Sequence, residues 1–217
     1  MASVFLTGAS GFMGRNLSAE LIRRGHAVRA LVQPGAADRV AGACEVVTGD
    51  PLAAASFQQR VAGCDTLVQL VGVSHPSPAK AAQFRTVDLI SAKASVAAAV
   101  AAGIRHFVYV SVAHPAPVMR EYIAARSEAE ETIRAAGLNA TILRPWYVLG
   151  PGRRWPLLLV PAYWILERLP STRETARRLG LVTLPQMVAA LVRAVENPAQ
   201  GIRIVEVPEI RGLFIPR

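Results

Sequence analysis

The feature that most constrains this chain is a glycine-rich turn directly after its first apolar stretch, residues 4–6. Behind the turn, Leu17, Leu21 and Ile22 recur at helical spacing. A strand, a glycine turn and a helix in this order suit the pyrophosphate of a dinucleotide, because glycine permits close backbone approach and a helix N-terminus attracts anions. The spacing is G-x-x-G-x-x-G and differs from the familiar G-x-G-x-x-G. The residues expected at the cofactor here are Gly8, Ser10, Gly11, Phe12, Met13, Gly14 and Arg15.

Beyond the turn, strand patterns alternate with helical patterns along most of the chain. The strands are expected at residues 4–6, 27–32, 44–48, 66–71, 106–111, 140–144 and 202–207, and the longer helices at 79–102, 118–136 and 185–196. Strands that alternate with helices imply right-handed crossovers and a parallel sheet. The sequence therefore predicts one α/β domain over residues 1–217, a doubly wound, Rossmann-like sheet with residues 150–184 as a small cap on the substrate side.

The most apolar stretch outside the strands is residues 155–169, which prolines interrupt and which is too short to cross a bilayer. It has three interpretations. As a lid, it would close a hydrophobic pocket walled by Trp146, Tyr147, Trp155 and Trp164. As a membrane contact, it would be assisted by Arg153, Arg154 and Arg168. As an ordinary buried helix, which we favour, it would have no direct role in binding.

The net charge is +9, and almost all of the basic residues are arginines. They are spread over both halves of the chain with acidic residues among them, whereas a nucleic-acid-binding protein more often has a concentrated basic face. We therefore expect a solvated basic surface and no nucleic-acid partner. Cys44 and Cys64 lack metal-ligand spacing, and no secretory pattern precedes the first strand. We expect reduced core cysteines, no metal site and a cytoplasmic location.

Several of these segments together resemble the short-chain dehydrogenase/reductase superfamily, in its extended and atypical branches, which include NmrA-like and epimerase-like proteins. The resemblance rests on TGASGFMGRNL at residues 7–17, on Tyr122 to Glu130 as Y-x-x-x-R-x-x-x-E, and on ILRP at 142–145 followed by LGPG. It implies an NAD(P)-binding Rossmann fold. It also implies cofactor contacts from residues that follow the later strands, namely Asp50, Pro51, Leu70, Val71, Gly72, Arg144 and Pro145.

The resemblance further implies that Tyr122 transfers a proton and that Ser111 polarises the substrate oxygen. Arg126 replaces the family's lysine four residues after the tyrosine. A free tyrosine titrates near ~10 and needs a nearby cation to work at neutral pH, and arginine supplies that charge with a bulkier fork. The sequence leaves open whether Tyr122 is an acid/base or a structural residue. His75 and His114 follow strands and could face the cleft, although a lone histidine is more often structural.

The choice between the two nicotinamide cofactors is only partly readable. Gln33 ends the second strand, at the position where NAD-preferring proteins have an acidic residue. No carboxylate there repels a phosphate, and Arg15 and Arg39 could approach one. The sequence therefore favours NADP over NAD, with the alternative that both arginines face solvent.

The leading hypothesis is an NAD(P)-dependent oxidoreductase or epimerase-like enzyme, in which hydride moves between nicotinamide and a small carbonyl or alcohol substrate. The short segment 150–184 argues against a large nucleotide-sugar substrate. The alternative is a non-catalytic NAD(P)-binding sensor or complex-assembly subunit, which the arginine at position 126 motivates. In related proteins, helices like 79–102 and 118–136 pair in a homodimer, and that interface is a further expectation.

Overall fold

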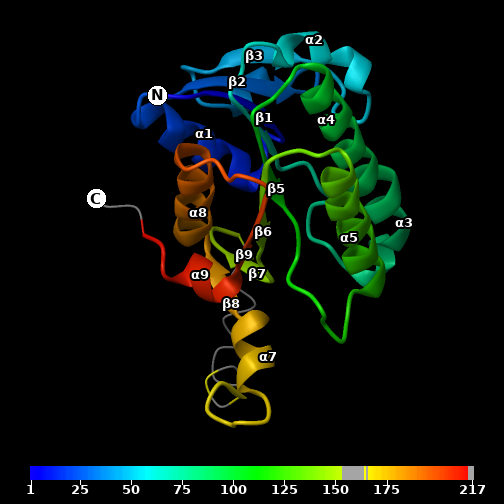
Figure 1. Ribbon diagram of the computed structural model, residues 1–217, viewed down its shortest axis with the longest axis vertical. Coiled ribbons are helices and arrows are strands. Elements are labelled where there is room, and N and C mark those ends of the chain that lie inside the picture. Colours follow the sequence, from blue (N-terminus) through cyan, green and yellow to red (C-terminus); the bar gives the residue numbers. More distant parts are fainter. Residues whose placement is uncertain (153–163, 165, 215–217) are drawn as a thin grey trace.

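The computed structural model describes residues 1–152, 164 and 166–214, and a parallel sheet of seven strands lies at its centre (Figure 1). Their order across the sheet is β3-β2-β1-β4-β5-β6-β9. The strands are β1 (Ser3–Thr7), β2 (Ala27–Val32), β3 (Glu45–Thr48), β4 (Thr66–Gln69), β5 (His106–Val110), β6 (Ala140–Arg144) and β9 (Ile202–Glu206). The order reverses between β1 and β4, and a ligand in such a sheet binds outside the carboxyl ends of the strands at that reversal. The predicted doubly wound α/β sheet is confirmed.

The central strands are apolar on both faces, which is typical of a parallel sheet covered by helices on both sides. In β1, Val4 and Leu6 face one core cluster, whereas Phe5 faces the other. All three side chains are fully buried. The period-2 alternation of a strand thus divides one short apolar run between two cores.

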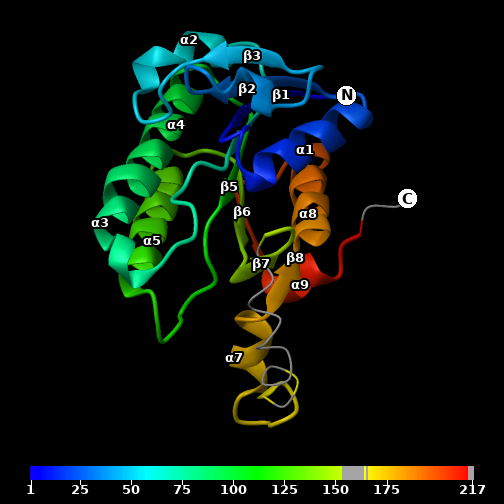
Figure 2. The ribbon, with the colours of Figure 1, turned by 180° about the vertical axis from the view of Figure 1, so that it is seen from behind.

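Helices cover both faces, as the two opposite views show (Figures 1 and 2). On one face lie α1 (Phe12–Arg23) and α8 (Leu184–Glu196), with α9 (Val207–Arg211) beside α8. On the other face lie α2 (Gln58–Val61), α3 (Ala81–Gln83), α4 (Ile90–Ala101) and α5 (Arg120–Ala135). Short 3-10 turns occur at Ala37–Arg39, Ala54–Ser56 and Pro78–Lys80. No helix among the described residues is long and apolar enough to cross a membrane.

The helix expected at residues 79–102 differs from the prediction, because it is not one continuous α-helix. Residues Phe84–Leu89 form a π-helical segment between α3 and α4. A π turn adds a residue to the helical repeat and changes the direction in which side chains point, often at a functional site. Here it accompanies the complete burial of a charged residue, Asp88.

The C-terminal part contains elements that the sequence did not indicate. Strands β7 (Tyr147–Leu149) and β8 (Leu181–Thr183) form a second, two-stranded parallel sheet, and α7 (Arg173–Arg178) precedes β8. The last strand ends at Glu206, where α9 begins. Residues 153–163 and 165, which include Arg153, Arg154, Trp155 and much of the apolar stretch, lie outside the described residues.

The described members of that stretch do not pack as a buried helix would. Trp164 is 60% exposed, and Leu166 and Leu169 are also exposed. The Arg168 guanidinium lies 3.2 Å from the centre of the Trp164 ring, a cation–π contact at the surface. The favoured interpretation of an ordinary buried helix is therefore wrong for these residues.

Candidate functional site

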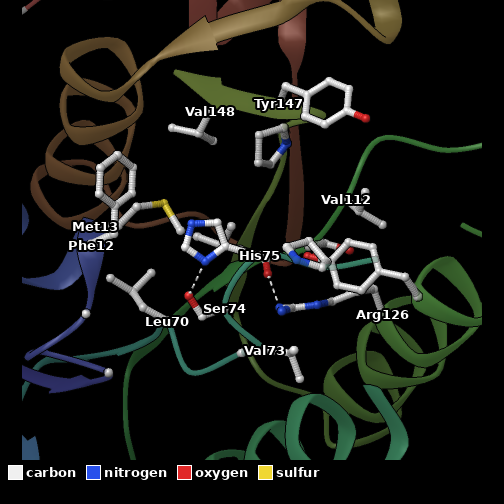
Figure 3. Close-up of a pocket in the computed structure, with 18 of the residues that line it drawn as sticks. Phe12, Met13, Leu70, Val73, Ser74, His75, Val112, Arg126, Tyr147 and Val148 are labelled. Carbon is white, nitrogen blue, oxygen red and sulfur yellow. Dashed lines mark hydrogen bonds between the residues drawn. The ribbon is translucent and has the colours of Figure 1, made fainter. Parts of the chain in front are cut away.

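A cavity of about 340 Å³ opens at the carboxyl ends of β1, β4, β5 and β6, where the sheet order reverses (Figure 3). The α1 turn forms one side, and residues of α5 and the segment after β6 form the other. The apolar part of its lining consists of Phe12, Met13, Leu70, Val73, Pro76, Val110, Val112, Met119, Pro145, Trp146 and Val148. A cavity with mostly apolar walls and a few converging polar groups is typical of a small-molecule site.

The glycine turn brings backbone to one side of this cavity. Gly8 has φ +71°, and a Cβ there would lie 2.8 Å from the carbonyl carbon of Leu70. A Cβ on Gly14 would collide with the carbonyl oxygen of Gly8. Gly11 caps α1, whose first N–H groups have no partner within the helix. The turn therefore has the close packing and the free helix end that a pyrophosphate group requires, and it fits the dinucleotide predicted from the sequence.

The structure brings together most, but not all, of the residues predicted from the sequence. Those that line the cavity are Gly8, Gly11, Phe12, Met13, Gly14, Leu70, Gly72, Ser111, Tyr122, Arg126 and Pro145. Those outside its lining are Ser10, Arg15, Gln33, Asp50, Pro51, Val71 and Arg144. Gln33 and Asp50 are exposed at the ends of β2 and β3, and the Asp50 Oδ1 accepts a hydrogen bond from the Leu52 N–H.

Arg126 is buried, with 6% of its surface exposed, and it lies one helical turn after Tyr122. Its Cζ atom is 5.2 Å from the centre of the Tyr122 ring and 5.6 Å from that of Tyr109. Its Nη1 donates to the Val110 carbonyl oxygen at 2.6 Å, and to the Tyr109 hydroxyl at 3.4 Å. The cation is therefore close to the tyrosine ring but is anchored to β5.

The other terminal nitrogen of Arg126, Nη2, donates to the Asp88 carboxylate in the π-helical segment. The second Asp88 oxygen accepts from the Val73 N–H at 2.9 Å. Burial alone would lower the pKa of Arg126, but Tyr109, Tyr122 and Asp88 outweigh it and raise that pKa above its ordinary value. The guanidinium is therefore charged and paired.

Ser111 directs its hydroxyl at the Glu130 carboxylate, to which it donates a hydrogen bond of 2.6 Å. Glu130 is 1% exposed and also accepts from Arg144 Nη2 at 2.6 Å and from Arg134 Nη2 at 2.9 Å. Burial raises the pKa of Glu130, but bonds from Arg144 and Ser111 hold it below its ordinary range. Arg144 reaches Glu206 as well, at 3.2 Å, so its charge serves the sheet edge and not the cavity.

The two candidate histidines separate in the structure. His75 lines the cavity and has φ 52°, a left-handed backbone that is uncommon for a residue with a side chain. Its Nδ1 is 3.0 Å from the Ser74 hydroxyl, and Figure 3 shows the ring near the middle of the cavity. His114 instead lies 3.6 Å from Glu130 and does not line the cavity.

Sequence reasoning missed the partners of the predicted residues. Asp88 gave no signal, because its pattern is that of an exposed position in a long helix. Glu130 was visible as the last residue of Y-x-x-x-R-x-x-x-E, but its role as acceptor for Ser111 and Arg144 depends on the packing of α5 against β6. Glu130 follows Tyr122 by eight residues, a spacing that places both side chains near one face of the helix. This spacing was the signal in the sequence that Glu130 is buried.

Comparison with known proteins identifies similar sequences and similar folds. The chain is 30% identical over 213 residues to a ceramide reductase of Caulobacter vibrioides, covering 96% of this chain and 65% of that protein. It is also 30% identical over 168 residues to the 4-hydroxy-2-methyl-3-oxo-4-farnesyl-3,4-dihydroquinoline-1-oxide ketoreductase of Stigmatella aurantiaca, covering 67% of this chain and 50% of that protein. The chain thus spans one half to two thirds of the length of these relatives.

Among solved structures, the enzyme WbmH of Bordetella bronchiseptica in complex with NAD+ superposes with a TM-score of 0.70 at 20% identity, over 95% of this chain and 75% of that one. This likeness concerns the fold. In sequence, residues 8–153 match the NAD(P)H-binding family. The matched range includes the glycine turn, Tyr122 and the segment after β6. The chain therefore belongs to the NAD(P)H-binding family, as the resemblance to the extended and atypical short-chain dehydrogenases/reductases predicted.

Proposed function

We propose that this protein is an NAD(P)-dependent reductase of a carbonyl compound with apolar substituents. The observation that carries the proposal is the cavity itself, which has a dinucleotide turn on one side, Tyr122 on the other, and apolar walls between them. The bound nicotinamide would supply the hydride. The residues of the chain would bind the cofactor, orient the carbonyl group and provide the proton.

The roles of the individual groups follow from their positions. The backbone of the glycine turn and the N-terminus of α1 would bind the pyrophosphate. The Tyr122 hydroxyl would give a proton to the substrate oxygen, as the resemblance implies. The Ser111 proton is directed at Glu130, so its oxygen is oriented as an acceptor and would hold a hydroxyl group of the substrate or product. Apolar walls would exclude water from the reacting groups.

An apolar substrate is supported by the lining and by the two relatives. A ceramide and a farnesyl-bearing compound both contain hydrocarbon chains, and their enzymes are a reductase and a ketoreductase. In this chain, Phe12, Trp146 and Val148 stand where such a chain would make contact. Each buried methylene contributes roughly 0.8 kcal/mol to binding. We therefore propose a substrate with larger apolar substituents than the small carbonyl or alcohol compound expected from the sequence.

NADP is the proposed cofactor. Gln33 has no charge that would repel a 2′-phosphate, and Arg15 and Arg39 are exposed near the same edge of the sheet. The double variant R15A/R39A should weaken NADPH binding and leave NADH binding nearly unchanged. Equal losses for both cofactors would reject phosphate recognition by this pair.

The reductase proposal is tested by following NADPH oxidation at 340 nm with ketones of increasing chain length. We expect kcat/KM to rise by about tenfold for every two methylenes that the cavity accommodates. Y122F should remove most of kcat while leaving NADPH affinity unchanged. NADPH binding without turnover of any ketone would reject the reductase.

That last outcome would favour a second function, a non-catalytic NAD(P)-binding sensor or assembly subunit. The observation behind it is that Arg126 and Ser111 are both occupied by carboxylates of the chain. A sensor should change shape or partner on binding, and limited proteolysis with and without NADPH would detect this. An identical cleavage pattern in both states, with measured turnover, would reject the sensor.

A further inference from the structure

Asp88 is a fully buried carboxylate in the π-helical segment between α3 and α4. A charge in such a place is unfavourable unless it is paired and hydrogen-bonded. Its two oxygens satisfy this condition through two different parts of the chain, Arg126 of α5 and the N–H of Val73 after β4. Asp88 thereby connects three elements at the edge of the cavity.

Arg126 is also buried, and its guanidinium packs directly against the backbone of Gly72. A Cβ on Gly72 would collide with the Arg126 Nη2 and would lie 3.1 Å from the Asp88 Oδ1. The guanidinium is therefore fixed between the loop after β4, the Val110 carbonyl and the π-helical segment. At any neighbouring group, the electrostatic effects of the Arg126 cation and the Asp88 anion have opposite signs and partly cancel.

The third group is Tyr122, whose ring centre lies 5.2 Å from the Arg126 Cζ. A lone cation at such a distance favours the tyrosinate and lowers the pH at which the tyrosine loses its proton. A carboxylate next to that cation has the opposite effect. The net influence of the pair on the Tyr122 hydroxyl is therefore much smaller than that of an arginine alone.

We propose that Asp88 is a positioning residue that fixes the Arg126 guanidinium and cancels its charge, so that Tyr122 titrates as a tyrosine beside a neutral pair. For its meaning in catalysis this inference rests on the proposed reductase, but the ionisation of Tyr122 is measurable without turnover. It predicts that Tyr122 stays protonated at neutral pH and is poised to donate a proton, the direction that carbonyl reduction requires.

Two other titratable groups face the same region. Burial raises the pKa of Tyr109 to about 12, so Tyr109 stays neutral at neutral and mildly basic pH. His75 lines the cavity from the loop after β4. An H75Q background removes this second titratable side chain from the cavity lining.

The experiment follows tyrosinate absorbance against pH in the full chain, and the Y122F titration is subtracted to isolate Tyr122. In the double variant D88N/R126Q both charges are gone, and we expect the Tyr122 midpoint to stay within about half a pH unit of the wild type. A rise of about one unit or more would show that Arg126 acts as an uncancelled cation, and it would overturn the proposal.

The single variant D88N provides the opposite test, because it leaves the cation alone. We expect the Tyr122 midpoint to fall by about one to three pH units, and D88E to restore it. An unchanged midpoint in folded D88N would also overturn the proposal. D88N leaves the buried Arg126 charge without a partner and therefore lowers stability, so a thermal melt of each variant accompanies its titration. If D88N does not fold, the result for D88N/R126Q alone tests the proposal.

A matched control uses an exposed ion pair of 2.8 Å between two neighbouring helices, formed by Lys93 of α4 and Glu128 of α5. K93Q/E128Q should leave the midpoint unchanged. The basic limb of kcat/KM should shift in the same order as the spectroscopic midpoints. If the Tyr122 midpoints are as expected but no ketone is turned over, the proposed reductase is rejected and the proposed role of Asp88 is retained. If ketones are turned over but the midpoints differ from those expected, the role of Asp88 is rejected and the reductase is retained.

Discussion

The two sides of the cavity are built in different ways. On the α1 side, the backbone of three glycines and the side chains of the adjacent Phe12 and Met13 form the surface. On the α5 side, residues from distant parts of the chain are held in place by the Asp88–Arg126 pair and the Glu130 cluster. The glycine turn depends on the absence of side chains at three positions, whereas the α5 side depends on buried charges that compensate one another. Mutations should therefore affect binding on the first side and folding on the second.

The largest effect is expected where a buried charge loses its partner. Asp88→Ala leaves the Arg126 charge without its carboxylate partner and the Val73 N–H without its acceptor, and should destabilise the fold by about 3–5 kcal/mol. Asp38→Ala, at an exposed position, should change stability by less than about 0.5 kcal/mol. Urea unfolding measures both. If both variants lose similarly little stability, the Asp88–Arg126 ion pair does not stabilise the α5 side of the cavity.

Glu130→Gln should have the next largest effect, about 2–3 kcal/mol, because Glu130 accepts hydrogen bonds from two charged groups, Arg134 and Arg144. Glu130 has a lowered pKa in the fold, so its contribution is complete above the ordinary value near 4.5 and is lost as the pH falls through the lowered value. The difference between wild type and variant should therefore be constant at neutral pH and should narrow in acid. A difference that widens in acid would contradict the lowered pKa.

On the backbone side, Gly8→Ala should weaken NADPH binding by roughly 10- to 100-fold, or about 1.4–2.7 kcal/mol. The matched control is Gly25→Ala, which has a similar positive φ of +81° but nothing within 4 Å of the added Cβ. Both variants bear the backbone penalty, so only the close approach differs. Calorimetry should find normal affinity for the control, and equal losses would place the effect in the backbone conformation.

The smallest effect is expected at a local feature far from the charges. Thr183 caps α8, and its N–H donates a hydrogen bond of 2.8 Å to the Gln186 Oε1. Thr183→Ala should reduce stability by about 1 kcal/mol and leave NADPH affinity unchanged. A change in affinity would show that α8 and the cavity are coupled more closely than the contacts indicate.

The same contrast explains what the sequence predicts. The glycine turn, the alternation of strands with helices and the Tyr122 motif are readable because each depends on a few consecutive residues or on a simple period. The buried state of Asp88 is not readable, since it depends on a π turn that shifts the helical repeat and on Arg126 arriving from α5. Arg144 shows the converse: a local motif predicts a cofactor contact, whereas the ion pairs of its side chain with Glu130 and Glu206, outside the cavity lining, depend on distant residues.

Gly72 has a consequence for how this chain can diverge. Its bare α-carbon packs against the Arg126 guanidinium, so a methyl group at residue 72 would force that end of the Arg126 side chain to shift. We therefore expect G72A to disturb the contacts of Arg126 with Asp88 and Val110, and a shorter side chain, as in R126K, to relieve the collision. Among descendants of this protein, we therefore expect selection against alanine at residue 72 wherever residue 126 is an arginine.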